Sequence, residues 1–111
     1  MARKQKTDLL RGTLDLLILR TLALRPLHGV GIADRIQQVT GGTFVVQAGS
    51  LFPALHRLEQ EGLIAGEWTT SDEGRRIKSY GLTSAGRRRL TAELKEWERI
   101  VTAVGQVLEA T

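Results

Sequence analysis

Apolar residues recur along the first half of the chain at spacings that predict helices. Residues 13–24 carry leucine and isoleucine on more than one side, which is typical of a helix buried within a core. Pro26 ends that helix, because proline cannot donate a backbone hydrogen bond to a further turn. Residues 29–39 predict a second helix, whose inward stripe repeats at helical spacing: Ile32, Ile36 and Val39.

A third helix is predicted to start at Ser50 and to stop before Gly62. Ser50 is a favoured N-cap residue, and Pro53 suits a first turn, where its missing N–H needs no partner. Gly62 is expected to end the helix, since glycine tolerates the left-handed conformation found there. The inward stripe of this helix consists of Leu51, Leu55 and Leu58.

Beyond this helix the pattern changes to two short extended segments and a long final helix. Residues 63–69 and 75–82 are predicted to pair as a hairpin across the polar turn at 71–74. Trp68, on the first of these strands, is expected to be structural. Thr83 is expected to cap a helix that reaches towards residue 110 and measures about 40 Å. A helix of that length needs a partner beyond this small chain.

The final helix carries an apolar stripe whose members are spaced 4, 3, 4, 3 and 4 residues apart. The stripe consists of Leu90, Leu94, Trp97, Val101, Val104 and Leu108, and it is widened by Ile100 and Val107. Such spacing is typical of a seam between helices. Because the stripe is short and the helix contains an internal glycine, Gly105, we expect docking against a second subunit rather than a free-standing coiled coil.

Composition narrows the possible chemistry. The 111 residues are 41% hydrophobic and suffice for one folding unit. The absence of cysteine excludes disulfides, thiolate metal sites and a cysteine nucleophile. The longest apolar stretch is interrupted by charges, and no signal segment precedes it, so we expect a cytoplasmic protein with no membrane partner.

Positive charge is concentrated in the front of the chain. Residues 1–89 hold fourteen basic and eight acidic residues, whereas residues 90–111 hold two and four. Together with a pI near 10.1, this asymmetry favours a polyanionic partner for the front part. Scattered solvated charge is the alternative explanation.

The predicted order of helix, helix, turn, helix, hairpin and helix is that of a winged helix-turn-helix. The expected fold class is mainly α with a small β-hairpin wing, with a DNA-binding part at residues 1–82 and a C-terminal dimerisation helix at residues 83–111 in the same folding unit. In such folds the third helix enters the major groove and the wing rests on the DNA backbone. Arg75, Arg76 and Lys78 would then reach phosphates. Three further cations, Arg3, Lys4 and Lys6, would form a mobile arm.

Three segments of the chain resemble the PadR family of bacterial winged-helix transcriptional regulators. They are LLRGTLDLLILRTLALRPLHGVGIADRIQ (residues 9–37), QAGSLFPALHRLEQEGLI (47–64) and RRIKSYGLTSAGRRRL (75–90), in the order and spacing of the family. The single last helix is similar to that of the short-tailed branch. The resemblance implies a homodimer that represses transcription at a palindromic operator until a small molecule releases it.

The resemblance also implies roles for particular residues. The segment from Ser50 to Pro53 would lead the recognition helix into the groove, and the wing cations would meet the backbone. From their chemistry, Phe52 is suited to thymine methyl or sugar contacts, or else to core packing, while Gln47 and His56 are suited to polar contacts. The full expected DNA-binding set is Gln47, Gly49, Ser50, Leu51, Phe52, Pro53, His56, Arg57, Arg75, Arg76 and Lys78.

Trp97 suggests where an effector would bind. In a two-fold dimer the two copies of a residue near the axis meet, so paired indoles would frame a cavity for a flat aromatic or drug-like ligand. The resemblance adds residues of the first helix, Leu10, Leu14 and Leu17, to that lining. Simple packing of Trp97 in the dimer core is the alternative. No cofactor and no metal are expected.

Other classes of function fit the sequence less well than a DNA-binding regulator. An enzyme is disfavoured, because the chain offers two isolated histidines and no Gly-rich loop before a lysine. The remaining alternative is a winged-helix module for protein association without specific DNA binding. Salt-dependent binding to duplex DNA separates the two, since only phosphate contacts release counterions.

Overall fold

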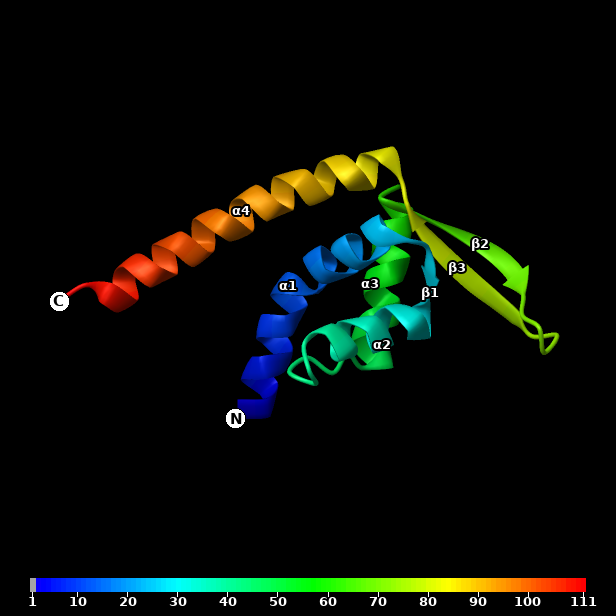
Figure 1. The fold of residues 1–111 in the computed structure, drawn as a ribbon, viewed down its shortest axis with the longest axis horizontal. Helices are drawn as coiled ribbons and strands as arrows, with labels where there is room; N and C mark the ends of the chain where they lie inside the picture. The colour runs from blue at the N-terminus through cyan, green and yellow to red at the C-terminus, as the bar shows by residue number, and fades with distance from the viewer. Residues whose placement is uncertain (1) are drawn as a thin grey trace.

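The computed structural model describes the backbone of residues 2–111 and the side chains of residues 13–111. Over that range the chain forms four helices and a three-stranded antiparallel sheet (Figure 1). In chain order the elements are α1 (Ala2–Leu24), β1 (Leu27–His28), α2 (Gly29–Val39), α3 (Ala48–Gln60), β2 (Ile64–Thr70), β3 (Arg76–Leu82) and α4 (Ser84–Glu109). The predicted fold class, mainly α with a small hairpin wing, is confirmed.

The core is aliphatic and lies where α1, α2, α3 and the start of the hairpin meet. Its most deeply buried side chains are Leu14, Ile18, Leu19, Leu22, Ile32, Leu51, Leu55, Leu58 and Ile64. Each such side chain contributes about 1.5–3 kcal/mol when it leaves water. Among residues 13–111 no polar or charged side chain is buried, so the core is held by apolar packing.

The first helix is longer than predicted. The structure extends α1 back to Ala2, whereas the apolar pattern suggested a start near Thr13. The segment that contains Arg3, Lys4 and Lys6, expected to form an arm, is helical in the structure. The side chains of these cations lie outside the described residues.

The start of α3 also differs from the prediction. Ser50 is not the N-cap: the helix begins at Ala48, and the extended Gln47 carbonyl accepts the N–H groups of Ser50 and Leu51 at 3.0 and 2.9 Å. Buried Val46 and Leu51 occupy the two positions of a hydrophobic staple, which outweighs the local preference of serine for a cap. Pro53 consequently lies inside the helix rather than in its first turn.

Gly62 ends α3 as predicted. It has a φ of 76°, and its N–H donates to the Glu59 carbonyl at 3.0 Å. The next N–H, of Leu63, donates to the Leu58 carbonyl at 3.0 Å, which completes a Schellman motif. The chain therefore turns directly from α3 into β2.

The sheet contains one strand that the sequence did not reveal. The two-residue strand β1 pairs with β3, Leu27 facing Tyr80 and His28 facing Ser79, and so gives the order β1-β3-β2. The predicted hairpin is confirmed, with Ile64 opposite Leu82 at its base and Thr70 opposite Arg76 near its tip. Because β1 leads straight into α2, it fastens the wing to the helical body.

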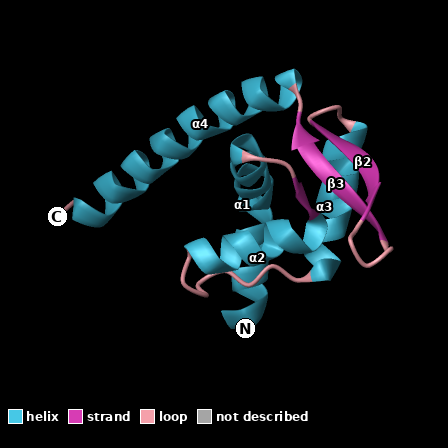
Figure 2. Ribbon diagram, turned by 45° about the vertical axis from the view of Figure 1, so that its right-hand side comes forward, coloured by secondary structure: helices cyan, strands magenta, loops and turns pink. Residues whose placement is uncertain are grey.

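A compact junction joins α3, β2 and α4. The Thr83 hydroxyl accepts the Gly86 N–H at 3.0 Å, which confirms Thr83 as the N-cap, and it donates to the Gly62 carbonyl at 2.7 Å. The Thr83 N–H donates to the Leu63 carbonyl at 3.2 Å. From this junction α4 passes over α1, buries Leu90, and then extends away from the rest of the molecule (Figure 2).

We predict that Gly86→Ala destabilises the fold by about 2–3 kcal/mol. An added Cβ would collide with the Leu63 carbonyl, which is backbone and cannot move aside. Urea unfolding measures the loss. Gly49→Ala is the matched control, because nothing lies within 4 Å of a Cβ there; equal stability of the two variants would contradict the prediction.

Candidate nucleic-acid interface

The recognition helix and the wing leave the same corner of the molecule and diverge. In Figure 1, α3 lies below the start of β2, while the hairpin of β2 and β3 extends outward to the right. The N-terminal half of α3 and the distal half of the hairpin thus form the two arms of an open angle. Most of the residues predicted to bind DNA lie on these two arms.

Several of the predicted α3 residues are exposed. Gln47, Gly49, Pro53 and His56 lie at the surface, and Ser50 is partly exposed. Leu51 differs, because its side chain is 2% exposed and belongs to the core. Leu51 therefore positions the helix from within.

Phe52 has two faces with different surroundings. Its side chain is 45% exposed. A Cβ placed on Gly29 would lie only 2.8 Å from the Phe52 Cε1, so the ring packs directly over the first residue of α2. Of the two interpretations of Phe52 from the sequence, packing describes the side of the ring over Gly29. The exposed side leaves room for an outward contact, which stays a prediction.

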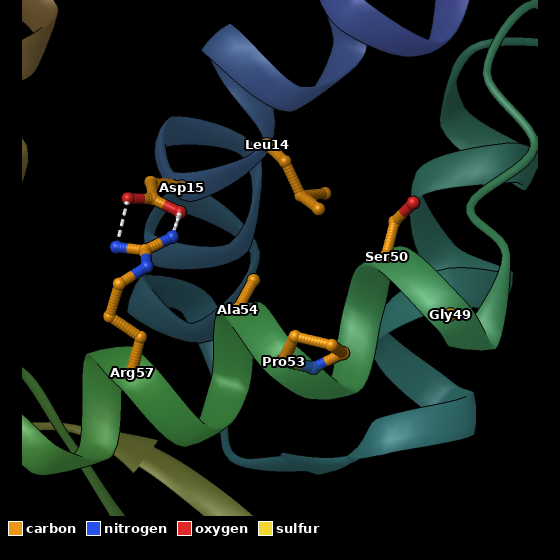
Figure 3. A pocket seen from close by; sticks show the side chains of 7 residues that line it. All are labelled: Leu14, Asp15, Gly49, Ser50, Pro53, Ala54 and Arg57. Atoms are coloured by element: carbon orange, nitrogen blue, oxygen red, sulfur yellow. Dashed lines mark hydrogen bonds and ion pairs between the residues drawn. The ribbon is translucent and has the colours of Figure 1, made fainter.

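Arg57 is tied to α1. Its two terminal nitrogens donate to both carboxylate oxygens of Asp15, at 2.8 and 2.7 Å (Figure 3). These hydrogen bonds raise the pKa of the Arg57 guanidinium above its ordinary value. The pair stands beside an open hollow of about 310 Å³ lined by Leu14, Asp15, Gly49, Ser50, Pro53, Ala54 and Arg57. Arg57 thus couples α3 to α1.

Lys78 also has a carboxylate partner inside the protein. Its Nζ donates to Glu59 Oε1 at 2.8 Å, and this hydrogen bond raises the pKa of Lys78. The lysine stem crosses Gly66, where an added Cβ would collide with it. Sequence reasoning missed Glu59, although its position three residues before Gly62, on the last turn of α3, places it close to the hairpin.

Arg75 and Arg76 have no such partner among residues 13–111. Within the described part of the chain, no carboxylate lies within ion-pair distance of either guanidinium. Arg76 instead stacks on Trp68, with 4.7 Å between its guanidinium carbon and the ring centroid. The four predicted cations of α3 and the wing therefore form two groups: Arg57 and Lys78 face other protein groups, whereas Arg75 and Arg76 are available to an external anion.

The predicted dimer stripe on α4 is exposed in the single chain except at its start. Leu90 is 7% exposed and belongs to the core. The stripe then becomes progressively more exposed along the helix, through Leu94, Trp97, Val101, Val104 and Leu108. Its outer half, which reaches 79% exposure at Leu108, packs against no core residue of the described part of the chain.

The structure does not bring the predicted effector residues together within one chain. Leu14 lines the hollow beside Arg57, whereas Leu17 lines a second hollow of about 300 Å³ between α1 and α2. Val39, predicted to face inward, borders that second hollow and is 64% exposed. Trp97 lines neither hollow, and the Leu10 side chain lies outside the described residues.

Two further findings concern other kinds of site. Among the described residues no cluster of three or more His, Asp or Glu side chains would hold a metal ion. In the same part of the chain, no helix combines the length and apolarity needed to cross a membrane.

The fold and the two-armed surface define a winged helix-turn-helix protein. Residues 18–92 match the model of the PadR-like family of transcriptional regulators. The chain is 34% identical over 94 residues to the transcriptional regulator Rv3488 of Mycobacterium tuberculosis, across 85% of this chain and 84% of that protein. The chain belongs to the PadR-like family and is a transcriptional regulator.

Solved structures support the same assignment. A PadR family transcriptional regulator from Eggerthella lenta is similar with a TM-score of 0.85 and 29% identity, over 99% of this chain and 94% of that one. A PadR-like transcriptional regulator from Bacillus cereus is similar with a TM-score of 0.80 and 29% identity, over 94% of this chain and 99% of that one. The likeness extends over α4 as well as the winged helix.

We predict a coupling of about 1 kcal/mol between Asp15 and Arg57, since the pair is bidentate but Arg57 is half exposed to screening solvent. The test is a double-mutant cycle of Asp15→Ala and Arg57→Ala followed by urea unfolding. Glu96 and Arg99, an exposed pair within α4, provide the control and should show weaker coupling. Purely additive losses at Asp15 and Arg57 would contradict the prediction.

Proposed function

We propose that this regulator binds a palindromic operator in double-stranded DNA as a homodimer. Each α3 enters the major groove and each hairpin lies along the neighbouring backbone. The observation that carries the proposal is the pairing of an exposed N-terminal half of α3 with two wing arginines, Arg75 and Arg76, that have no carboxylate partner in the described part of the chain. No catalytic role is assigned to any residue.

Within this proposal the α3 side chains read the bases. Gln47 and His56 supply hydrogen-bonding groups, and the exposed side of Phe52 meets thymine methyl groups or sugars. Ser50 and Pro53 border the approach to the groove. Leu51, Arg57 and Lys78 serve indirectly, because their side chains hold the recognition helix and the wing in place.

Phosphate contacts come from the wing and from the start of α3. Arg75 and Arg76 supply the charge. The N–H of Gly49 lies in the first turn of α3, where backbone donors point out of the helix towards an anion. Phosphate contacts fix the position of the protein on the duplex, whereas the base contacts fix the sequence.

The homodimer rests on α4. A stripe of large apolar side chains from Leu94 to Leu108 is exposed over the second half of the helix. Two copies packed along this stripe would cover it and would set the spacing of the two recognition helices, which must lie about 34 Å apart to read successive major grooves. We propose repression as the outcome, since a dimer on an operator obstructs transcription.

The proposal includes release by a small aromatic or drug-like effector. Trp97, 42% exposed, lies midway along the exposed stripe, so two copies would offer indole faces to a flat ligand between the subunits. A ligand held there would alter the distance between the recognition helices and so lower operator affinity.

The first test is an anisotropy titration of the protein with DNA from its own promoter, with shuffled DNA as competitor. With six to ten phosphate contacts, affinity should fall by about 10³- to 10⁵-fold between 50 and 200 mM salt. Equal affinity for both DNAs, or none for either, would overturn the proposed operator binding and favour a protein-association module.

The second test concerns the dimer. Val101→Asp places a charge on the exposed stripe, so we expect a monomer in sedimentation experiments. Operator affinity should fall by about 100-fold or more, because one half-site no longer helps the other to bind. Gln106→Asp adds the same charge to the opposite face of α4 and should remain dimeric. A monomeric Val101→Asp variant that binds operator with full affinity would refute the two-fold arrangement.

A further inference from the structure

We propose that Trp68 is a positioning residue for DNA binding, which holds the Arg76 guanidinium ready for a backbone phosphate. This inference rests on the proposed function. It assigns to Trp68 a role in binding rather than in stability, contrary to the structural role expected from the sequence.

The exposure of Trp68 is the first observation. The side chain is 56% exposed, so more than half of this large aromatic surface remains in water. In the core of the chain it would bury 150–250 Å² and stabilise the fold, as aromatic side chains generally do. An indole that is left at the surface of the hairpin contributes little to the core.

The neighbours of Trp68 are the second observation. The register places Lys78 directly opposite Trp68 and Arg76 diagonally opposite on the same face of the hairpin. Both cations lie over the ring, with 5.7 Å from Lys78 Nζ and 4.7 Å from the Arg76 guanidinium carbon to its centroid. The indole is therefore a platform for two cations.

The two cations differ in whether their N–H groups already have a carboxylate partner. Lys78 is already bonded to Glu59 and also lies 5.5 Å from the Tyr80 ring centroid, so its charge is used within the protein. Arg76 has no carboxylate partner among the described residues. Among the described residues, its guanidinium contacts the ring of Trp68 and no charged group.

Stacking and ion pairing restrain an arginine in different ways. A carboxylate partner occupies the N–H edge of the guanidinium, which is the edge that binds phosphate. An aromatic ring contacts the flat face and leaves the N–H edge free. Trp68 thus restricts the motion of Arg76 without competing with DNA, and this lowers the entropy lost when a phosphate is bound.

The location of the platform fits this role. On the same face of the hairpin, the Lys78 side chain crosses over Gly66 and forms its ion pair with Glu59 at the end of α3. Trp68 and Arg76 lie further towards the hairpin tip on that face, the one that Glu59 of α3 contacts through Lys78. In Figure 1 the hairpin and α3 diverge and leave an open angle between them. DNA bound by α3 would occupy this angle.

A double-mutant cycle on operator affinity tests the inference. Trp68→Leu removes the ring but keeps an apolar side chain, and we expect operator binding about five- to thirty-fold weaker, because each of two wings loses a cation–π contact. Arg76→Ala should weaken binding further and reduce the salt dependence by about two phosphates. In the Arg76→Ala background, Trp68→Leu should have no additional effect.

Arg75 provides the matched control, since it is a neighbouring wing cation that does not stack on Trp68. In the Arg75→Ala background the loss caused by Trp68→Leu should persist in full. Trp68→Phe keeps a ring face and should retain most of the affinity. Urea unfolding should give nearly equal stabilities for the Trp68 variants, because the side chain is exposed.

The outcomes separate this inference from the proposed function. Specific binding by the unaltered protein, with losses at Trp68 and Arg76 that simply add, would overturn the positioning role. So would full affinity of Trp68→Leu. Failure of the unaltered protein to prefer its operator would overturn the proposed function, and the inference would fall with it.

Discussion

The orientation of every functional element depends on the hydrogen bonds made by two adjacent carbonyl groups, those of Gly62 and Leu63. The first accepts the hydroxyl of Thr83 and the second accepts its N–H, at the point where α3 ends, β2 begins and α4 starts. Gly86 lets the first turn of α4 approach the same carbonyl. Recognition helix, wing and projecting helix therefore diverge from one rigid corner, whose geometry is set by backbone groups rather than by long side chains.

Much of this architecture could be predicted from local patterns. The α2 boundaries, the glycine stop at Gly62, the cap at Thr83 and the hairpin all follow from residue types with strong backbone preferences. The errors arose where tertiary packing prevailed. Burial of Val46 and Leu51 moved the start of α3 ahead of Ser50, and β1 is too short to leave a periodic signal.

The sequence could predict which residue types form the candidate site, but not which of its cations are left unpaired by carboxylates of the protein. The sequence identified Arg57, Arg75, Arg76 and Lys78 as equivalent cations, because a sequence does not say which acid each one meets. The structure separates them: Asp15 and Glu59, distant in the chain from Arg57 and Lys78, neutralise those two. The same limit applied to Trp68, because its proposed role depends on its contact with the Arg76 guanidinium across the hairpin.

The contact between Phe52 and Gly29 has a consequence for how this regulator can diverge. Any side chain larger than hydrogen at position 29 would displace the ring, and a different residue at position 52 would leave a gap over the start of α2. These two positions are therefore expected to change together or not at all. Gln47 and His56 are exposed, so substitutions there leave the core packing unchanged. Under the proposed function, a change of operator preference would therefore arise more readily at these two positions than at Phe52.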